Sequence, residues 1–198
     1  LPADAITLGT PGVRYGATVN VAADGWAPGY TFSGWKTNDA SAENGAFTMP
    51  ANNVAFTGTF AARTDTAYRV EYYYQSGGAY DAEPVVEARA GTTGQAASLS
   101  EADMTPARAG YAYDGAAANV TTGEIAGDGS LVLALYYDRQ TFTVTYTDGV
   151  EGEGVFANAV FENVRYGAAT PVYAEGAAPQ RQGYVFGGWD VEIAATVT

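Results

Sequence analysis

The residue types that perform most protein chemistry are few in this sequence. It contains no Cys and no His, so thiol nucleophiles, imidazole bases and the common zinc sites are excluded. Asp148, Glu151 and Glu153 lie in a glycine-rich segment and could hold calcium, but their spacing matches no EF-hand loop. We interpret them as a solvated turn. Three acids nearer the N-terminus receive the same interpretation: Asp24, Asp39 and Glu43.

No other motif indicates catalysis. The glycines form no phosphate-binding loop, because neither Gly-x-Gly-x-x-Gly opening a helix nor Gly-Lys-Ser/Thr occurs. Paired carboxylates for glycoside hydrolysis would need a cleft, which small modules rarely form. Lys36 is the single lysine, so at most one Lys–Asn or Lys–Asp isopeptide crosslink is possible, and we expect none. The prediction is a protein that is not an enzyme, with no catalytic, cofactor-binding or metal-binding residue.

The composition is that of a folded, β-rich and acidic protein. The 198 residues are 47% hydrophobic, 13% aromatic and 16% charged, with 25 Gly and 15 Tyr, which favours sheets joined by tight turns. The net charge of -13 repels phosphate backbones and anionic membranes, so we expect no nucleic-acid partner. No stretch approaches the roughly 20 apolar residues of a membrane-spanning helix. We therefore expect no membrane insertion here, with any sorting segment outside this fragment.

The sequence repeats itself. Residues 13–17 and 164–168 both read Val-Arg-Tyr-Gly-Ala. Downstream of each copy comes Gly-Tyr-x-Phe-x-Gly-Trp, at 29–35 and 183–189, and a degenerate copy that lacks the Trp lies at 109–115. Two motifs recurring in the same order indicate tandem structural units. Three Gly-Tyr pairs predict three modules.

Strand signals place the module boundaries. Four segments alternate apolar with small or polar residues, the period of a half-buried strand: 54–60, 68–74, 131–137 and 142–146. These set three modules at 1–63, 64–139 and 140–198, with very short joints that favour a semi-rigid string. The first module lacks a recognisable opening strand, and the third stops before its expected closing strand.

Helical signals are weaker. Residues 96–108 offer a cap at Ser98 or Ser100 with acids following it, which predicts a short helix. Residues 154–163 suit either a second short helix or a strand, and both alternatives stay open. The expected fold class is mostly β or α+β.

The repeated aromatic motif suits a core. Tyr30 and Phe32 share one face of a strand, whereas Trp35 has the opposite parity. A bulge at residues 33–34 would turn the Trp into the same core and leave Lys36 in solvent. Residues 187–188 before Trp189 permit the same bulge. We interpret these aromatics as structural, with a sugar-stacking platform as the alternative.

Other positions carry local predictions. Gly16 and Gly167 follow a Tyr where a positive φ is expected, and 127–129 is a tight-turn signal. Tyr73 and Tyr136 are expected to be neighbours on outward strand faces. Such a pair is explained by cross-strand pairing or by contact with a sugar or a partner.

The motifs resemble known repeat families. The first and third modules resemble internalin-type B repeats of the Listeria–Bacteroides repeat group, through the Tyr-Gly turn, Gly-Tyr-x-Phe-x-Gly-Trp and the segment 47–54. The middle module is similar to a mucin-binding-protein (MucBP) type repeat over 68–74, 91–94, 123–131 and 135–138. The resemblance implies small β-grasp-like modules in an elongated string. It contributes no catalytic residue.

The resemblance also implies a function and a location. We expect non-catalytic extracellular stalk or spacer repeats of a Gram-positive cell-wall-anchored adhesin, attached to the bacterial surface through segments outside this fragment. The alternative is a module that binds mucin glycans or host glycoproteins directly. The expected partners are neighbouring repeats of the same chain and, under the alternative, a host mucin or glycoprotein.

Overall fold

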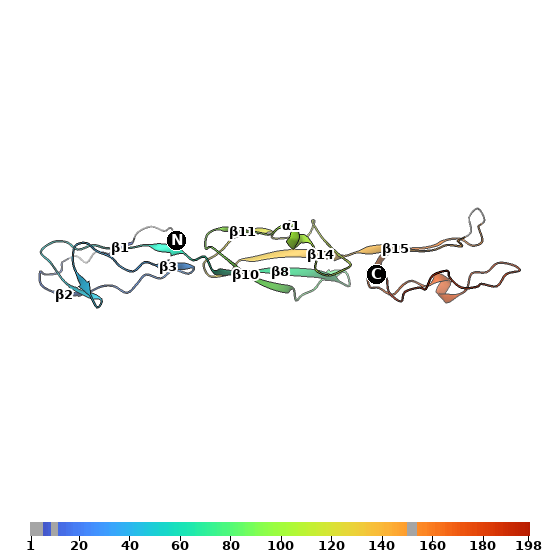
Figure 1. Ribbon diagram of the computed structural model, residues 1–198, viewed down its shortest axis with the longest axis horizontal. Coiled ribbons are helices and arrows are strands. Elements are labelled where there is room, and N and C mark those ends of the chain that lie inside the picture. Colours follow the sequence, from blue (N-terminus) through green and yellow to red (C-terminus); the bar gives the residue numbers. More distant parts are fainter. Residues whose placement is uncertain (1–5, 9–11, 150–153) are drawn as a thin grey trace. The chain divides into compact units, whose positions relative to one another are not determined.

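The computed structural model describes residues 6–8, 12–149 and 154–198 of the chain (Figure 1). Strands make up 39% of it and helices 3%, arranged as several small sheets, which confirms the mostly-β prediction. Two acids of the proposed turn, Glu151 and Glu153, lie outside the described residues.

The elements follow one another as β1 (Ile6–Leu8), β2 (Thr18–Asn20), β3 (Tyr30–Phe32), β4 (Ala42–Glu43), β5 (Ala46–Thr48), β6 (Phe56–Gly58), β7 (Phe60–Ala62), β8 (Thr66–Ser76), β9 (Ala79–Tyr80), β10 (Val85–Gly91), β11 (Ala96–Ser98), α1 (Glu101–Met104), β12 (Tyr111–Tyr113), β13 (Thr122–Glu124), β14 (Val132–Arg139), β15 (Thr141–Tyr146), β16 (Ala159–Arg165) and a 3-10 turn at Tyr173–Gly176. Contacts group them into two compact units: Leu1–Glu71 with Val86–Leu99 and Val120–Ala134, and Tyr72–Val85 with Ser100–Asn119 and Leu135–Thr198.

The largest sheet has the strand order β10-β8-β14-β12, with β9 paired to β8; β8, β10 and β14 are labelled in Figure 1. Strand β14 lies inside this sheet and is its most buried strand, since Leu133 and Leu135 are 0% exposed and Tyr137 is 1% exposed. Val70 on β8 is also fully buried. The alternation in β8 and β14 therefore works as predicted, because one face of each strand supplies the core.

The first third of the chain forms three smaller sheets, β1-β6, β3-β7 and β2-β5-β4. The segment predicted as one strand over 54–60 is two strands, β6 and β7. They separate at Thr59, whose N–H donates to the Ser33 hydroxyl while its carbonyl accepts from the Ser33 N–H. The sequence also missed β1, which pairs with β6 ahead of the first repeated motif.

The predicted helix over 96–108 is wrong except for one turn. Residues 96–98 form β11, which pairs with β13, and only α1 is helical. Ser100 caps it, because its N–H donates to the Asp103 carboxylate and its hydroxyl accepts from the Asp103 N–H. Thr105 then turns extended, as a residue before a proline prefers. For 154–163, the strand alternative is correct from Ala159 onward.

Candidate functional site: a repeated junction motif

A turn with the same backbone hydrogen bonds occurs three times, and we call it the junction turn. It comprises Tyr15–Gly16, Thr93–Gly94 and Tyr166–Gly167. The three glycines have φ of 76°, 77° and 71°, the left-handed region that glycine occupies without strain. The positive φ predicted for Gly16 and Gly167 is therefore confirmed.

Each junction turn is tied to a segment about thirty residues downstream. The glycine N–H donates to the carbonyl of a downstream residue. The N–H of that same residue donates back to the carbonyl of the residue after the glycine. The glycine bonds reach Met49, Ile125 and Val197 at 2.9, 2.9 and 2.6 Å, and the return bonds reach Ala17, Gln95 and Ala168 at 2.8, 2.9 and 2.9 Å. We call each junction turn, together with the downstream segment that it bonds, a frame. Three equivalent frames therefore follow one another along the chain.

Two of the three Gly-Tyr pairs begin short strands. Tyr30 on β3 pairs with Ala62 on β7, and Tyr111 on β12 pairs with Arg139 on β14. We call the next residue after each closing strand the linker residue. The linker residues, Arg63 and Gln140, donate their N–H groups to the carbonyls of Gly29 and Gly110, both at 2.9 Å.

The linker residue also bonds forward. The Arg63 carbonyl accepts from the Thr93 N–H at 2.9 Å, and the Gln140 carbonyl accepts from the Tyr166 N–H at 2.8 Å. One residue is thus hydrogen-bonded to the Gly-Tyr glycine behind it and to the junction turn ahead of it. We call this arrangement the junction motif, and it is built twice.

Side chains reinforce the first junction motif. The Thr93 hydroxyl donates to the Gly29 carbonyl at 2.8 Å and lies 2.6 Å from the buried Thr66 hydroxyl. Gly29, with φ of 77°, leaves no room for a Cβ, which would meet Thr93 side-chain atoms and the backbone of Gly127. The backbone at Gly29 can therefore lie close to Thr93 and Gly127 only because residue 29 is glycine.

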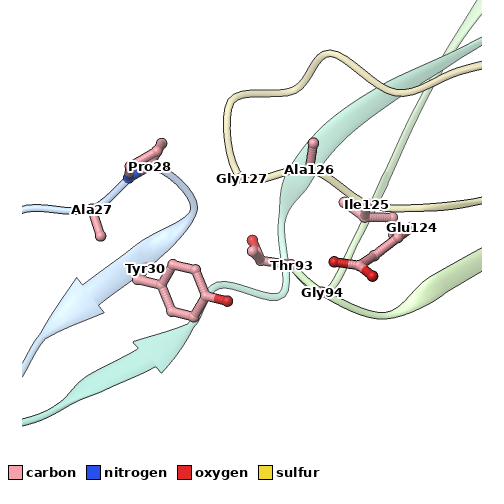
Figure 2. Close-up of a pocket in the computed structure, with 9 residues that line it drawn as sticks. All are labelled: Ala27, Pro28, Tyr30, Thr93, Gly94, Glu124, Ile125, Ala126 and Gly127. Atoms are coloured by element: carbon pink, nitrogen blue, oxygen red, sulfur yellow. The ribbon is translucent and has the colours of Figure 1, made fainter. Parts of the chain in front are cut away.

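Beside this junction lies a pocket of about 200 Å³, in which the Tyr30 hydroxyl, Thr93 and the Glu124 carboxylate face one another (Figure 2). Glu124 is the one charged residue among the nine that line it. The Thr93 hydroxyl already bonds the Gly29 carbonyl and the Thr66 hydroxyl, so it is not an activated nucleophile paired with that carboxylate. The pocket is a gap beside a packed junction.

In the second junction motif, the Tyr166 ring lies directly on Gly110, again with no space for a Cβ. The Arg139 guanidinium donates to the Tyr166 carbonyl and lies beside Gly167. Gly110, like Gly29, has a φ of 77°. The two junctions therefore use different side chains around the same backbone arrangement and the same glycine.

The repeated Trp residues lie where the bulge prediction places them. Gly34 and Gly188 have positive φ, and the rings of Phe32 and Trp35 meet edge-on at 5.0 Å and 70°. Phe186 and Trp189 repeat this at 5.1 Å and 68°. Trp35 is half-buried and donates its indole N–H to the Ala23 carbonyl at 3.0 Å, as a structural aromatic does.

The side chain of Lys36 is exposed, as the bulge predicts. Its backbone forms an antiparallel bridge with Thr57. An isopeptide crosslink forms between buried, acid-assisted partners, so an exposed lysine does not suit one.

The predicted tyrosine neighbours do meet. Tyr73 and Tyr136 stack with ring centroids 4.7 Å apart and planes 10° apart, and Tyr80 packs edge-on against Tyr136 at 4.8 Å. The sequence did not identify Tyr80, whose hydroxyl donates to Asp114 at 2.7 Å and to Asp138 at 2.8 Å. These five residues form the tyrosine cluster.

The hydrogen bonds of the tyrosine cluster shift the pKa values of Tyr80 and Asp114. Partial burial, and then the hydrogen bonds to Asp114 and Asp138, raise the pKa of Tyr80 above its ordinary value. The same hydroxyl lowers the pKa of Asp114. Both shifts keep Tyr80 protonated and Asp114 ionised, which preserves the hydrogen bond between them. The cluster is a satisfied polar network.

Two of the acids suspected of binding calcium are hydrogen-bonded to backbone N–H groups in the described part of the chain. Asp148 accepts from the Val155 N–H at 2.7 Å, and Asp39 accepts from the Ala55 N–H at 3.0 Å. Within residues 6–8, 12–149 and 154–198, no group of three or more acids is arranged to hold a metal ion. In the same part of the chain, no helix is long and apolar enough to cross a membrane.

Comparison with known families finds matches at both ends of the chain. Residues 5–64 match the Divergent InlB B-repeat domain, and residues 142–197 match the Listeria-Bacteroides repeat domain. No curated protein matches the chain. The two segments that share the Gly-Tyr-x-Phe-x-Gly-Trp motif are thus similar to repeat domains of the internalin B and Listeria–Bacteroides type.

Proposed function

We propose that this chain is a non-catalytic spacer from the extracellular stalk of a cell-wall-anchored adhesin of a Gram-positive bacterium. The junction motif carries the proposal. A spacer must hold successive modules in a defined relation, and here one linker residue is hydrogen-bonded to the frame on each side of it. Backbone bonds in place of long side chains suit that task, because they lose little side-chain entropy on forming.

The repeat matches support the same proposal. Domains of the Listeria–Bacteroides type are compatible with an extracellular repeat region, and only such domains are found in the chain. The acidic surface, with a net charge of -13, favours solubility of a long array. In the first copy of the repeated motif, Phe32 packs against Trp35 and Phe60, so this copy serves folding.

The proposed module boundaries stay at 1–63, 64–139 and 140–198. Each module then contains one junction turn and one Gly-Tyr pair, and the linker residues Arg63 and Gln140 fall at the two boundaries. On this division the middle module is a third variant of the same frame, and we propose that it is of the MucBP type.

Distance measurements test the spacer function. The chain has no cysteine, so spin labels can be attached at introduced cysteines, one per module: Ser41→Cys, Glu101→Cys and Glu162→Cys, all at exposed positions. We expect a narrow distance distribution for each adjacent pair. Gly29→Ala should broaden only the 41–101 distribution, and Gly110→Ala only the 101–162 distribution.

Matched controls are Gly16→Ala and Gly183→Ala, which have the same positive φ with open space where the Cβ would lie. They should leave both distributions narrow. Broad distributions in the unsubstituted chain would refute the spacer function, because the junctions would then not restrain the modules.

Direct binding of mucin glycans or host glycoproteins is the competing function. The stacked Tyr73 and Tyr136 rings favour it, because aromatic faces bind sugars. Each ring already covers one face of the other, which leaves less area for a ligand. Saturable retention on immobilised mucin that is lost with Tyr73→Ala would establish binding, and absence of retention would leave the spacer function.

A further inference from the structure

The loop between β4 and β5 is a two-residue hairpin turn made of Asn44 and Gly45. Their φ angles are 54° and 76°, both positive as in a type I′ turn, for which Asn-Gly is a preferred pair. Both residues are exposed. No other asparagine in the sequence is followed by glycine. The pair therefore suits the turn, and it also places a reactive dipeptide at the surface.

The reaction of this dipeptide is an attack of the chain on itself. The Gly45 backbone nitrogen forms a bond to the Asn44 Cγ, and the C–N bond of the Asn44 side-chain amide breaks. Ammonia leaves and takes the hydrogen of the Gly45 N–H with it, so that a succinimide ring remains. No oxidant, metal or cofactor is required. Glycine favours this attack because it has no Cβ to cover its nitrogen.

Water then opens the ring at one of its two carbonyl carbons. Attack at the Cγ restores the ordinary main chain and leaves aspartate at position 44. Attack at the main-chain carbonyl carbon leaves isoaspartate, in which the main chain runs through the Cβ and Cγ and is one atom longer. Both products carry a new carboxylate next to Glu43.

The structure leaves both reacting groups available. Neither the Asn44 side chain nor the Gly45 N–H makes a hydrogen bond among the described residues, and nothing lies within 4 Å of the place where a Gly45 Cβ would be. The attack also requires the turn to relax. Strand β4 is an exposed edge strand of two residues, held by two pairings with β5. Local opening of such an edge costs little free energy.

Another asparagine in the described part of the chain provides an internal comparison. Asn163 has a φ of 57° and is also exposed. It lies within β16, however, and it is followed by Val164, which is paired with Phe142. The branched valine side chain is stiff and crowds the nitrogen that would have to attack. A similar φ and exposure therefore occur without the glycine, and Asn163 should react much more slowly than Asn44.

We propose that Asn44-Gly45 is a self-modification site, at which the folded chain converts Asn44 into aspartate and isoaspartate without an enzyme. The aspartate form keeps the hairpin, because Asp tolerates a left-handed φ. The isoaspartate form does not, since its longer main chain no longer fits a two-residue type I′ turn. Strand β4 then separates from β5, and the Gly45 carbonyl releases the Val21 N–H, which it now accepts at 2.8 Å. One end of the β2-β5-β4 sheet therefore loosens with time.

Incubation of the full chain at mildly alkaline pH tests the proposal. Peptide mapping by mass spectrometry should show conversion of Asn44 into its two acidic products, and an isoaspartate-specific methyltransferase should label one of them. Gly45→Ala should slow the conversion at least about tenfold, because the added Cβ covers the attacking nitrogen. In the purified isoaspartate form the Val21 N–H should lose protection from hydrogen exchange. The Asn44→Asp variant should keep it.

A peptide of residues 40–49 serves as the clock, because it carries the same dipeptide without the fold. The incubation lasts until this peptide has converted, and an unchanged Asn44 in the chain at that time would overturn the proposal. So would conversion of Asn163 at the rate of Asn44, or conversion of Gly45→Ala at the rate of the parent chain. An isoaspartate form that protects Val21 as well as Asn44→Asp does would also overturn it. None of these outcomes bears on the spacer function, which depends on the two junction motifs.

Discussion

Gly110 offers the sharpest test of the junction motif. Replacing it with alanine adds a methyl group at a φ of 77°, which costs about 1–2 kcal/mol because of backbone crowding in the left-handed region. The methyl group would also overlap the Tyr166 ring, and overpacking costs a further ~1–3 kcal/mol. The expected loss for Gly110→Ala is therefore about 2–5 kcal/mol, a large part of the stability of a small domain.

Gly183→Ala separates the two causes. Gly183 occupies the same motif position with a φ of 82°, but nothing lies within 4 Å of the added methyl group. It should cost only the backbone part, about 1–2 kcal/mol. Urea denaturation followed by hydrogen exchange of separate segments would measure both variants.

Removing the ring completes the test. In the Gly110→Ala background, Tyr166→Ala should recover about 1–3 kcal/mol, because the overlap disappears with the ring. The reasoning fails if Gly110→Ala and Gly183→Ala cost the same, or if Tyr166→Ala recovers nothing.

Three further predictions concern the middle module and its first junction. Thr93→Val removes the hydroxyl that bonds Gly29 and Thr66, and should cost about 1–3 kcal/mol in urea denaturation; an equal cost for the exposed Thr31→Val would contradict this. Leu135→Ala empties a fully buried site and should cost about 2–5 kcal/mol, whereas a change below ~1 kcal/mol would place the core elsewhere. Folding raises the pKa of Tyr80 above 10.0 and lowers that of Asp114 below 3.8. The hydrogen bond between them therefore contributes its full stability between pH 3.8 and pH 10.0. This contribution is lost as pH rises through the folded-state pKa of Tyr80, or as pH falls through the folded-state pKa of Asp114. Urea denaturation at a series of pH values should show that Tyr80→Phe reduces the loss of unfolding free energy at alkaline pH. Part of this loss should remain, because the pKa of buried Tyr137 is also raised. An unchanged dependence of stability on pH in Tyr80→Phe would exclude Tyr80 as a cause.

The sequence predicted what depends on local pattern. The alternation of β8 and β14, the bulge before Trp35 and the positive φ of Gly16 all follow from side-chain parity or from the absence of a Cβ. The stacked Tyr73 and Tyr136 follow from the same parity. Each of these features needs only a few neighbouring residues to be specified.

Features that depend on distant segments were missed. The break at Thr59 is imposed by Ser33 across the sheet, and the helix expected over 96–108 is shortened because its first residues pair with β13. Tyr80 reaches Asp114 and Asp138 only once β9, β12 and β14 are assembled. Nothing in the local sequence around Tyr80 marks those partners.

The linker residue has a consequence for how such chains evolve. Arg63 and Gln140 contribute only their backbone N–H and carbonyl groups to the bonds that join the frames. Because its side chain makes none of these bonds, the linker position can accept many residue types. The junction motif depends mainly on the glycine that the linker residue bonds, Gly29 or Gly110. The side chains at positions 63 and 140 can therefore diverge while the backbone hydrogen bonds of the junction motif stay the same.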